Sequence, residues 1–371
     1  MRNAHIDRLR GIAIAMVILG HSPRFIGEWQ PIPPLWVYNH IVTGAYFGVS
    51  IFFVISGYLI TSKFIVHGSG PLAVNARKFY IQRISRIVPP LALMILVSAG
   101  IAMIQGAHIG ALNLVNAMLA LLQIDISAAG NLIPHTDSSW DALWSLRIEE
   151  LFYIFLPIFA LILVTQQRLS LFLMGAVAVG LFNRTQNHAD IYSFYSTFDQ
   201  LSIGGLTAIY RSRARDHIPH GILIAGSVLA ALGLLAVYLT AAPTDAPSST
   251  AVALCAAALI IAMPSMAASR AIFWPLESLG RLSYEVYLTH MMILWALAPL
   301  GRMTLQTTYP HASAAALLAA SFLLCYAVGY AFSALYSEPL NRAARRLLLG
   351  EPDTRVEGPS AIVPASSPAA E

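Results

Sequence analysis

The sequence predicts an all-α, polytopic membrane helical bundle of about ten transmembrane helices, with the N- and C-termini cytoplasmic. Of its 371 residues, 57% are hydrophobic and only 11% are charged, whereas about 25% of the residues in ordinary soluble domains are charged. Apolar stretches that approach the ~20 residues needed to cross a bilayer recur along nearly the whole chain. We attribute the net charge of +4 to membrane topology and anionic lipid, so no nucleic-acid partner is expected.

The first predicted span, 11–27, follows a short basic segment, as in a secretory signal. The sequence "GHSPRF" in the last part of this run has no small-x-small cleavage pattern, so a retained span is expected. The run 111–124 is too short to cross a bilayer and suits a re-entrant or interfacial helix better. The other spans are predicted at nine apolar runs: 42–61, 87–104, 144–165, 169–182, 199–210, 220–240, 249–267, 282–300 and 312–336.

The basic residues decide between ten and eleven spans. With ten spans and a cytoplasmic N-terminus, 18 of the 22 lysines and arginines fall on the inner side, as the positive-inside rule requires. An additional span at 111–124 would instead export the cluster "RSRAR" at 211–215. We therefore predict a membrane domain over 1–346, followed by a disordered cytoplasmic tail over 347–371 that is rich in Pro, Ala and Ser.

Two histidines, His21 and His290, lie well inside predicted spans, where an ionisable side chain is costly and normally faces a cavity or a partner. About three helical turns separate Arg10 from His21, so the two side chains share a face, with His21 about 16 Å further into the membrane. This spacing predicts a polar site inside the bundle. The alternative is that Arg10 anchors the helix at the inner surface and His21 is a hydrogen-bonded packing residue.

The segment "WSLRIEELFYIFLP" begins the span that enters from outside. On this topology Glu149 lies about two turns deep, near the level of His21. A carboxylate at that depth could orient the imidazole and raise its basicity. Glu150 points about 100° away, so Glu149 is the predicted partner. A glutamate that only pairs with Arg147 at the membrane interface is the alternative.

The segment "FYIQRISRIVPP" lies on the predicted cytoplasmic side. Arg83 and Arg86 are i and i+3 neighbours on one helical face, directly before Pro89 and Pro90, which are expected to open the third span. Two guanidinium groups in this arrangement could bind phosphates bidentately. Binding of lipid head groups by a basic flank is the alternative.

The segment "LGRLSYEVYLTH" begins the ninth span. Tyr284, Tyr287 and His290 recur every three residues and so follow one side of the helix, where they could line a cavity that runs upward from the cytoplasm. Interfacial anchoring explains the tyrosines almost as well. It does not explain His290, which lies about 12 Å further along the helix.

The second span carries several small residues, which let helices approach one another closely. Packing is therefore their expected role. These residues are Gly48, Ser50, Ser56 and Gly57.

The order of these motifs resembles that of the acyltransferase 3 family of integral-membrane O-acyltransferases. The stretch "RGIAIAMVILGH" matches the arginine, ten residues and histidine of that family's first span. The stretches "FFVISGYLI", "RISR", "WSLRIEELFYIFLP" and "LGRLSYEVYLTH" are similar to other characteristic segments of the family, and the resemblance extends over about residues 5–346. The stretch "YSEPLNR" lacks the residue that is common between the glutamate and the proline, so no role is carried over to Glu338.

The resemblance implies an O-acyltransferase of the inner (plasma) membrane. Its donor substrate is expected to be cytoplasmic acetyl-CoA or another acyl-CoA, and no metal is expected. The implied acceptor is a hydroxyl of a carbohydrate or glycolipid of the cell envelope, or of a small natural product such as a macrolide. Monomer and homodimer both stay open.

The resemblance also implies roles for individual residues. His21 is expected to act as general base on the acceptor hydroxyl, with a transient acyl-histidine as the alternative route. Glu149 is expected to hold the imidazole, and Arg10 to position the donor or polarise the site. The expected donor-binding residues are Arg83, Arg86, Tyr287 and His290.

A proton-coupled transporter is the rival function, because intramembrane His, Glu and Arg also serve proton relays. The sequence shows no internal repeat and no matching pair of broken helices, which argues against a transporter. A flippase-like protein that moves an acyl carrier without chemistry is a third possibility. Both rivals predict no release of CoA.

Overall fold

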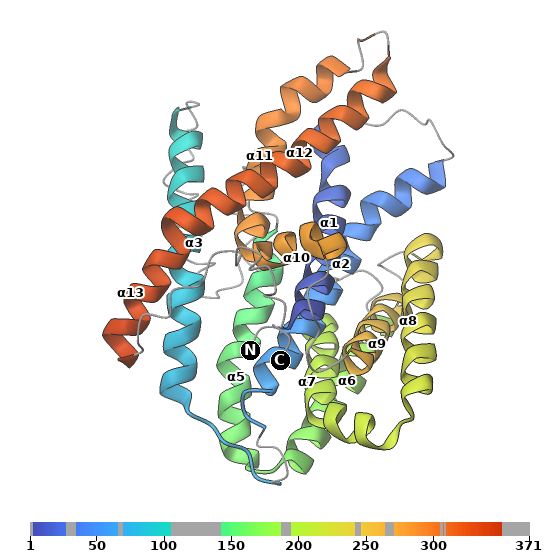
Figure 1. The fold of residues 1–371 in the computed structure, drawn as a ribbon, viewed down its shortest axis with the longest axis vertical. Coiled ribbons are helices and arrows are strands. Elements are labelled where there is room, and N and C mark those ends of the chain that lie inside the picture. The colour runs from blue at the N-terminus through green and yellow to red at the C-terminus, as the bar shows by residue number, and fades with distance from the viewer. Residues whose placement is uncertain are drawn as a thin grey trace, which may run out of the picture.

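The computed structural model describes residues 3–26, 35–65, 70–104, 142–186, 194–241, 246–263, 271–304, 307 and 309–350. Within these ranges the chain is helical, apart from turns and two isolated β-bridges. The all-α class is therefore confirmed for the described residues, whereas the run 111–124 lies outside them. A long helix overlaps each of the ten predicted spans (Figure 1): α1 (Ala4–Ile26), α2 (Leu35–Thr61), α3 (Ala76–Ile104), α5 (Leu143–Leu163), α6 (Gln166–Gln186), α7 (Phe194–His217), α8 (His220–Thr240), α9 (Ala246–Ala262), α11 (Ser283–Thr304) and α12 (Pro310–Phe332).

Shorter elements lie on either side of the last two long helices. The 3-10 turn η2 (Ala271–Phe273) leads into α10 (Trp274–Arg281), which directly precedes α11. The predicted span 312–336 does not end at 336, because α12 continues through the π-helical segment η3 (Ser333–Ser337) into α13 (Glu338–Leu349). Gly350 ends α13 in the left-handed conformation, with φ 64°, which is common after a helix C-terminus. Residues 351–371 of the predicted tail lie outside the described residues.

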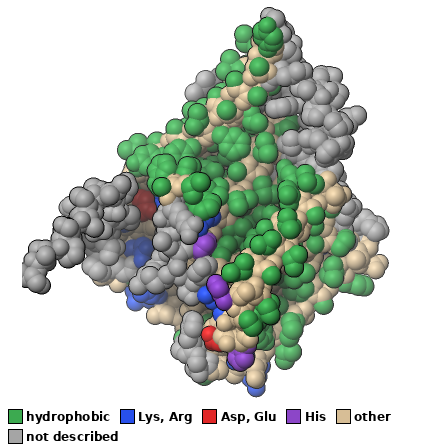
Figure 2. Space-filling model, turned by 45° about the vertical axis from the view of Figure 1, so that its right-hand side comes forward, with side chains coloured by type: hydrophobic (Ala, Val, Ile, Leu, Met, Phe, Trp, Pro, Cys, Tyr) green, Lys and Arg blue, Asp and Glu red, His purple; other side chains and the backbone are tan. Residues whose placement is uncertain are grey.

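Apolar side chains cover the outside of the bundle, as expected of a protein in lipid. Three described stretches are long and apolar enough to cross a membrane, namely Ala76–Ser98, His220–Thr240 and Ala312–Leu349. In α8, Leu229 is 69% exposed and Ile222 60% exposed. Figure 2 shows a broad apolar face of the molecule. The bundle is therefore that of a membrane protein. Ten crossings and two cytoplasmic termini stay predictions.

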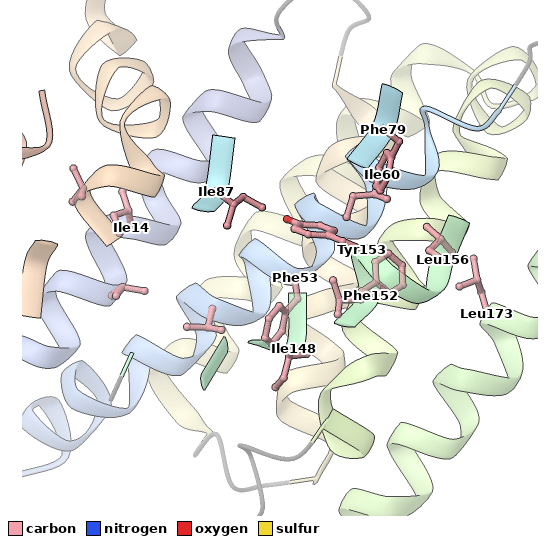
Figure 3. Close-up of a cluster of buried hydrophobic side chains, with 14 of the residues drawn as sticks. Ile14, Phe53, Ile60, Phe79, Ile87, Ile148, Phe152, Tyr153, Leu156 and Leu173 are labelled. Atoms are coloured by element: carbon pink, nitrogen blue, oxygen red, sulfur yellow. The ribbon is translucent and has the colours of Figure 1, made fainter. Parts of the chain in front are cut away.

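The core lies where α1, α2, α5 and α7 meet. Phe53, Ile148 and Phe152 are all less than 2% exposed and belong to one large buried cluster. Figure 3 shows Tyr153 at the edge of this cluster, with its hydroxyl oxygen directed toward Ile87 of α3. The apolar packing therefore fixes α5 against α2 and presents one polar atom between α3 and α5.

Glycines let two helix pairs approach backbone to backbone. A Cβ atom on Gly57 of α2 would clash with the carbonyl oxygen of Leu201 in α7, and one on Gly204 of α7 would clash with that of Val54 in α2. A Cβ atom on Gly280 of α10 would likewise clash with the Asp7 carbonyl of α1. The packing role predicted for Gly57 agrees with this contact, since only glycine leaves room for the facing backbone.

A buried ion pair joins α6, α7 and α9. Arg184 is 6% exposed and Asp199 is fully buried, and the Arg184 Nη2 atom lies 2.5 Å from Asp199 Oδ2. The Thr250 hydroxyl of α9 donates to the same carboxylate at 3.1 Å, and Arg184 Nη1 donates to the Ser196 carbonyl at 2.8 Å. The pair therefore stabilises the contact of three helices with charged groups removed from solvent.

We expect Asp199→Leu to lower the free energy of unfolding by about 3–5 kcal/mol, because it leaves the Arg184 guanidinium buried without its counter-charge. The double variant Arg184→Met/Asp199→Leu should recover most of this loss, because it removes both charges. Titration of the purified proteins with SDS, followed by circular dichroism, measures both effects. Equal losses in the single and double variants would contradict this account.

Candidate active site

A cavity that is partly open to the outside lies among α1, α2, α3, α5 and α11. Five side chains on its wall come from four segments that the sequence predicts as functional, although they are up to 277 positions apart in the sequence. The bundle therefore brings together one residue of α1, two of α3, one of α5 and one of α11. These residues are Arg10, Arg83, Arg86, Glu149 and Tyr287.

The start of α1 is fixed by ion pairs on two sides. The Arg10 guanidinium lies 3.6 Å from the Asp7 carboxylate one turn earlier, and Arg10 lines the cavity. Arg8 faces another way and pairs with the buried Glu277 of α10 at 2.7 Å. Arg10 therefore borders the cavity, whereas Arg8 ties α1 to α10.

The α3 helix begins earlier than predicted. The Asn75 side chain accepts a hydrogen bond from the Lys78 backbone N–H at 3.0 Å, so Asn75 caps a helix that starts at Ala76. Pro89 and Pro90 consequently lie inside α3 and do not open the span, which corrects the prediction. The two arginines stand on the helical turns before the proline pair.

The two α3 arginines have different surroundings at the cavity. The Arg83 guanidinium lies 4.6 Å from the centre of the Tyr153 ring, and its Nε atom is buried without a hydrogen-bond partner in the described residues. Arg86 lines the same cavity and is exposed. An anion entering the cavity would therefore meet one stacked guanidinium with an unused donor and one exposed guanidinium.

The Glu149 carboxylate is bound on both oxygens, but not by His21. Ser56 Oγ donates to Oε1, and the Tyr153 hydroxyl donates to Oε2 at 2.8 Å. The sequence predicts that Glu149 orients His21, whereas the structure directs this carboxylate to α2 and to its own helix. Helix depth places two residues at one level, but it does not determine which side of the helix each faces.

His21 lies against His290, the other histidine predicted inside the membrane. Their ring centroids are 5.2 Å apart with the planes at 66°. The His21 Nδ1 atom lies 2.8 Å from the Val17 carbonyl oxygen. Because a carbonyl only accepts, Nδ1 carries the hydrogen and Nε2 is the basic nitrogen of the neutral ring. The His290 Nδ1 atom likewise donates to the Tyr287 carbonyl at 2.6 Å.

Tyr287 connects the histidine pair to the cavity. Its ring centroid is 5.4 Å from that of His290, and its hydroxyl lies 2.6 Å from Ser145 Oγ. His290 is fully buried, and its Nε2 atom has no hydrogen-bond partner in the described part of the chain. His290 therefore contacts Tyr287 and His21 but is not among the residues that line the cavity. The donor-binding role predicted for His290 would require a place on the cavity wall.

Sequence reasoning missed two side chains that hold Glu149. The small side chain of Ser56 is predicted to serve packing, yet its hydroxyl donates to the Glu149 carboxylate. Tyr153 reads in the sequence as part of an apolar run, although it stands one helical turn after Glu149 and so shares its face. That i, i+4 spacing was the available signal for Tyr153, whereas the Ser56 contact depends on how α2 packs against α5.

Several known proteins are similar in sequence to this chain. Residues 3–330 match the acyltransferase 3 family, which is described as an acyltransferase domain. The chain is 30% identical over 304 residues to the "Putative membrane-bound transacylase BcsY" of Komagataeibacter xylinus, with 78% of this chain and 72% of that protein covered. No solved structure matches the chain.

Two further relatives differ in how much they share. "Nodulation protein 10" of Rhizobium leguminosarum bv. viciae is 27% identical over 329 residues, with 78% of this chain and 82% of that protein covered. A "Putative O-acetyltransferase" of Staphylococcus aureus (strain COL) is 31% identical over 177 residues, which make up 43% of this chain and 24% of that protein. The chain therefore matches only a quarter of the staphylococcal relative but most of the other two.

Proposed function

The chain belongs to the acyltransferase 3 family and is a membrane acyltransferase, and on this premise we propose its substrates. The donor is cytoplasmic acyl-CoA, with acetyl-CoA as the first choice. The acceptor is a hydroxyl of a carbohydrate or glycolipid of the cell envelope, reached from the inner (plasma) membrane.

The observation that carries this proposal is the position of the cationic cavity next to the histidine pair. Arg10, Arg83 and Arg86 line the cavity, and guanidinium groups bind phosphate oxygens through charge-assisted hydrogen bonds. Tyr287 lines the same cavity and contacts His290, which in turn contacts His21. A donor held by its phosphates at the arginines would direct its acyl end toward the histidines.

His21 acts as the general base in this proposal. Its Nε2 atom takes the proton of the acceptor hydroxyl as the hydroxyl oxygen attacks the thioester carbonyl carbon. The C–O bond forms, the C–S bond breaks, and the CoA thiolate takes the proton back from the His21 imidazolium to leave as the free thiol. In the alternative route His21 itself attacks the thioester and carries the acyl group transiently.

Glu149 and His290 are positioning residues. The Glu149 carboxylate holds Ser56 and Tyr153, and Tyr153 lies beneath the Arg83 guanidinium, so Glu149 helps to place a donor-binding arginine. His290 packs against the His21 ring and restricts its orientation. Both roles follow from contacts, and neither requires Glu149 to touch His21.

Release of CoA tests the proposed function. Purified protein in lipid nanodiscs is mixed with acetyl-CoA and a crude envelope-glycan extract, and free thiol is measured over time. We expect release that depends on both acceptor and protein, with an acetylated product detectable by mass spectrometry. Absence of release with acetyl-CoA and with longer acyl-CoA donors, from folded protein, would overturn the acyl-CoA proposal.

Donor binding should weaken at alkaline pH because of Lys63, which follows the end of α2. Burial and the neighbouring Arg83 and Arg86 lower the pKa of Lys63 from 10.5 to about 8. Bound phosphates favour the charged amine, so binding takes up a proton above pH 8. CoA affinity should therefore fall by up to about tenfold per pH unit between pH 8 and 10. Calorimetric titration across this range measures the slope.

Lys63→Met is the matched control for this pH dependence. The variant should bind CoA more weakly at pH 7 and show a flatter profile above pH 8, since it has no amine to titrate. An unchanged slope in Lys63→Met would assign the pH dependence to another group and refute the role of Lys63.

A further inference from the structure

The C-terminal helix α13 packs against the helix that carries the two donor-site arginines. Figure 1 shows α13 continuing from α12 and crossing beside α3, and residues of α13 and α3 are in contact. This helix lies beyond the family match, which ends at residue 330. The family match therefore gives no role to α13.

A side-chain hydrogen bond fixes the register of α13 on α3. Ser85 Oγ donates to Asn341 Oδ1 at 3.0 Å, and Ser85 is buried directly before Arg86. Arg345 is one helical turn after Asn341 and so lies on nearly the same face of α13. The hydrogen bond therefore turns Arg345 toward the face of α13 that meets α3.

A second hydrogen bond joins the turn after α2 to the same stretch of α3. The Lys63 Nζ atom donates to Gln82 Oε1 of α3 at 3.3 Å. Burial lowers the pKa of Lys63, and the positive charges of Arg83, Arg86, Arg345 and Lys78 lower it further. Three separate segments, namely the turn after α2, the first turns of α3, and α13, thus bring positive charge to the stretch of α3 that contains Gln82 and Ser85.

Such a gathering of like charges favours the binding of an anion, and Arg86 also has the Glu285 carboxylate of α11 in its surroundings. The acyl-CoA donor carries two kinds of phosphate: a diphosphate in the chain that leads to the thioester and a single 3′-phosphate on the ribose. Arg83 and Arg86 line the cavity and so suit the diphosphate. Lys63 and Arg345 do not line the cavity, and α13 packs against α3, which carries both arginines.

We propose that α13 completes the donor site, with Arg345 and Lys63 binding the 3′-phosphate of the CoA nucleotide. This inference rests on the acyl-CoA donor proposed above. It assigns a ligand-binding function to a helix outside the matched domain, and it predicts that the protein distinguishes CoA from dephospho-CoA, which lacks only the 3′-phosphate.

The test is calorimetric binding of CoA and dephospho-CoA to the full-length protein in nanodiscs of neutral lipid. Wild type should bind CoA about 10- to 100-fold more tightly, as expected of a charge-assisted phosphate contact. Arg345→Ala should lose this preference while its affinity for dephospho-CoA stays within about twofold. A preference retained in Arg345→Ala would overturn the inference.

Arg346→Ala is the matched control, because Arg346 points about 140° away from Asn341 around the same helix. It removes an equal charge from α13 and should keep the preference for CoA. Loss of the preference in both variants would show a general effect of α13 charge and overturn the specific role of Arg345.

Two more outcomes distinguish failure of this inference from failure of the proposed acyl-CoA donor. Wild type that releases thiol from acetyl-CoA but binds CoA and dephospho-CoA equally overturns only the role of α13. Wild type that binds neither nucleotide and releases no thiol overturns the acyl-CoA donor itself, and the inference with it.

An anionic lipid head group has the same phosphate chemistry and would be the competing ligand. Repeating the binding measurements in nanodiscs that contain phosphatidylglycerol distinguishes the CoA phosphate from the lipid phosphate as the ligand. The proposal expects the CoA preference in both lipids. If Arg345→Ala reduces retention of phosphatidylglycerol and leaves CoA binding unchanged, the cluster binds lipid and the proposal is overturned.

Discussion

Replacing His21 with alanine is expected to lower the rate of acyl transfer by about 10²- to 10⁴-fold, the usual contribution of a positioned general base. The His21 Nδ1 atom donates to the Val17 carbonyl, so in the neutral ring Nε2 carries the lone pair that takes the acceptor proton. His21 contacts His290, which contacts Tyr287 on the wall of the arginine-lined cavity, and His21 itself does not line that cavity. The variant should therefore bind CoA with nearly the wild-type affinity and fail in the chemical step. Steady-state thiol release and calorimetric CoA binding measure the two effects separately.

His217→Ala is the matched control for the His21 variant. His217 is an exposed residue of α7 whose Nδ1 atom lies 2.8 Å from the carbonyl of Arg213, four residues earlier. It thus makes the same kind of intrahelical contact as His21 but neither lines the cavity nor belongs to the His21–His290 pair. We expect His217→Ala to retain wild-type activity. Transfer at the native rate by correctly inserted His21→Ala protein would refute the base assignment.

The acyl-histidine route is separable with the same proteins. Acetyl-CoA without acceptor should leave the wild-type protein unmodified if His21 is only a base. An acetyl group on the His21 peptide after rapid quenching, with one equivalent of thiol released, would instead establish covalent transfer. Either result keeps His21 at the reacting atoms, because both routes use its Nε2 lone pair.

The helices of the bundle were largely predictable from the sequence, because each depends on a local property of the chain. Apolar runs near the bilayer length fix the position of elements such as α8, and no tertiary contact is needed to find them. Their ends were less predictable. The early start of α3 depends on the Asn75 side chain, and the extension of α12 into α13 follows a polar, amphipathic sequence that hydropathy alone does not mark.

The sequence predicted several of the residues that belong to the candidate site, but not which of them contact one another. Helical depth brought Glu149 to the level of His21, and the structure places Glu149 on the cavity wall with Arg10. Which residues touch depends on how each helix is rotated in the bundle. The close approach of α2 to α7 at Gly57 is part of the packing that sets this rotation. For that reason Ser56 emerged as a partner of Glu149, and His290 as the neighbour of His21, only in the structure.

Replacing Arg83 with alanine is expected to raise the KM for acetyl-CoA by about 10- to 150-fold. A hydrogen bond to a charged group contributes about 1.5–3 kcal/mol, which corresponds to that range of affinity. Phosphates remote from the thioester are bound alike in the ground and transition states, so kcat should change little. Arg83→Lys should recover only part of the loss, because an ammonium group lacks the planar fork that contacts two phosphate oxygens. Initial rates over a range of acetyl-CoA concentrations give both constants.

Arg77→Ala tests whether the effect needs the position of Arg83 or only positive charge near the membrane surface. Arg77 is an exposed residue in the first turn of the same helix and does not line the cavity. Its loss should leave the KM for acetyl-CoA within about twofold at physiological salt, since exposed charges are screened over about 8 Å. If Arg77→Ala and Arg83→Ala raise KM equally, the arginines act as a diffuse basic flank for anionic lipid. If only Arg83→Ala does, the guanidinium stacked on Tyr153 is a specific contact for the donor, and Glu149, which holds Tyr153, acts on donor binding through it.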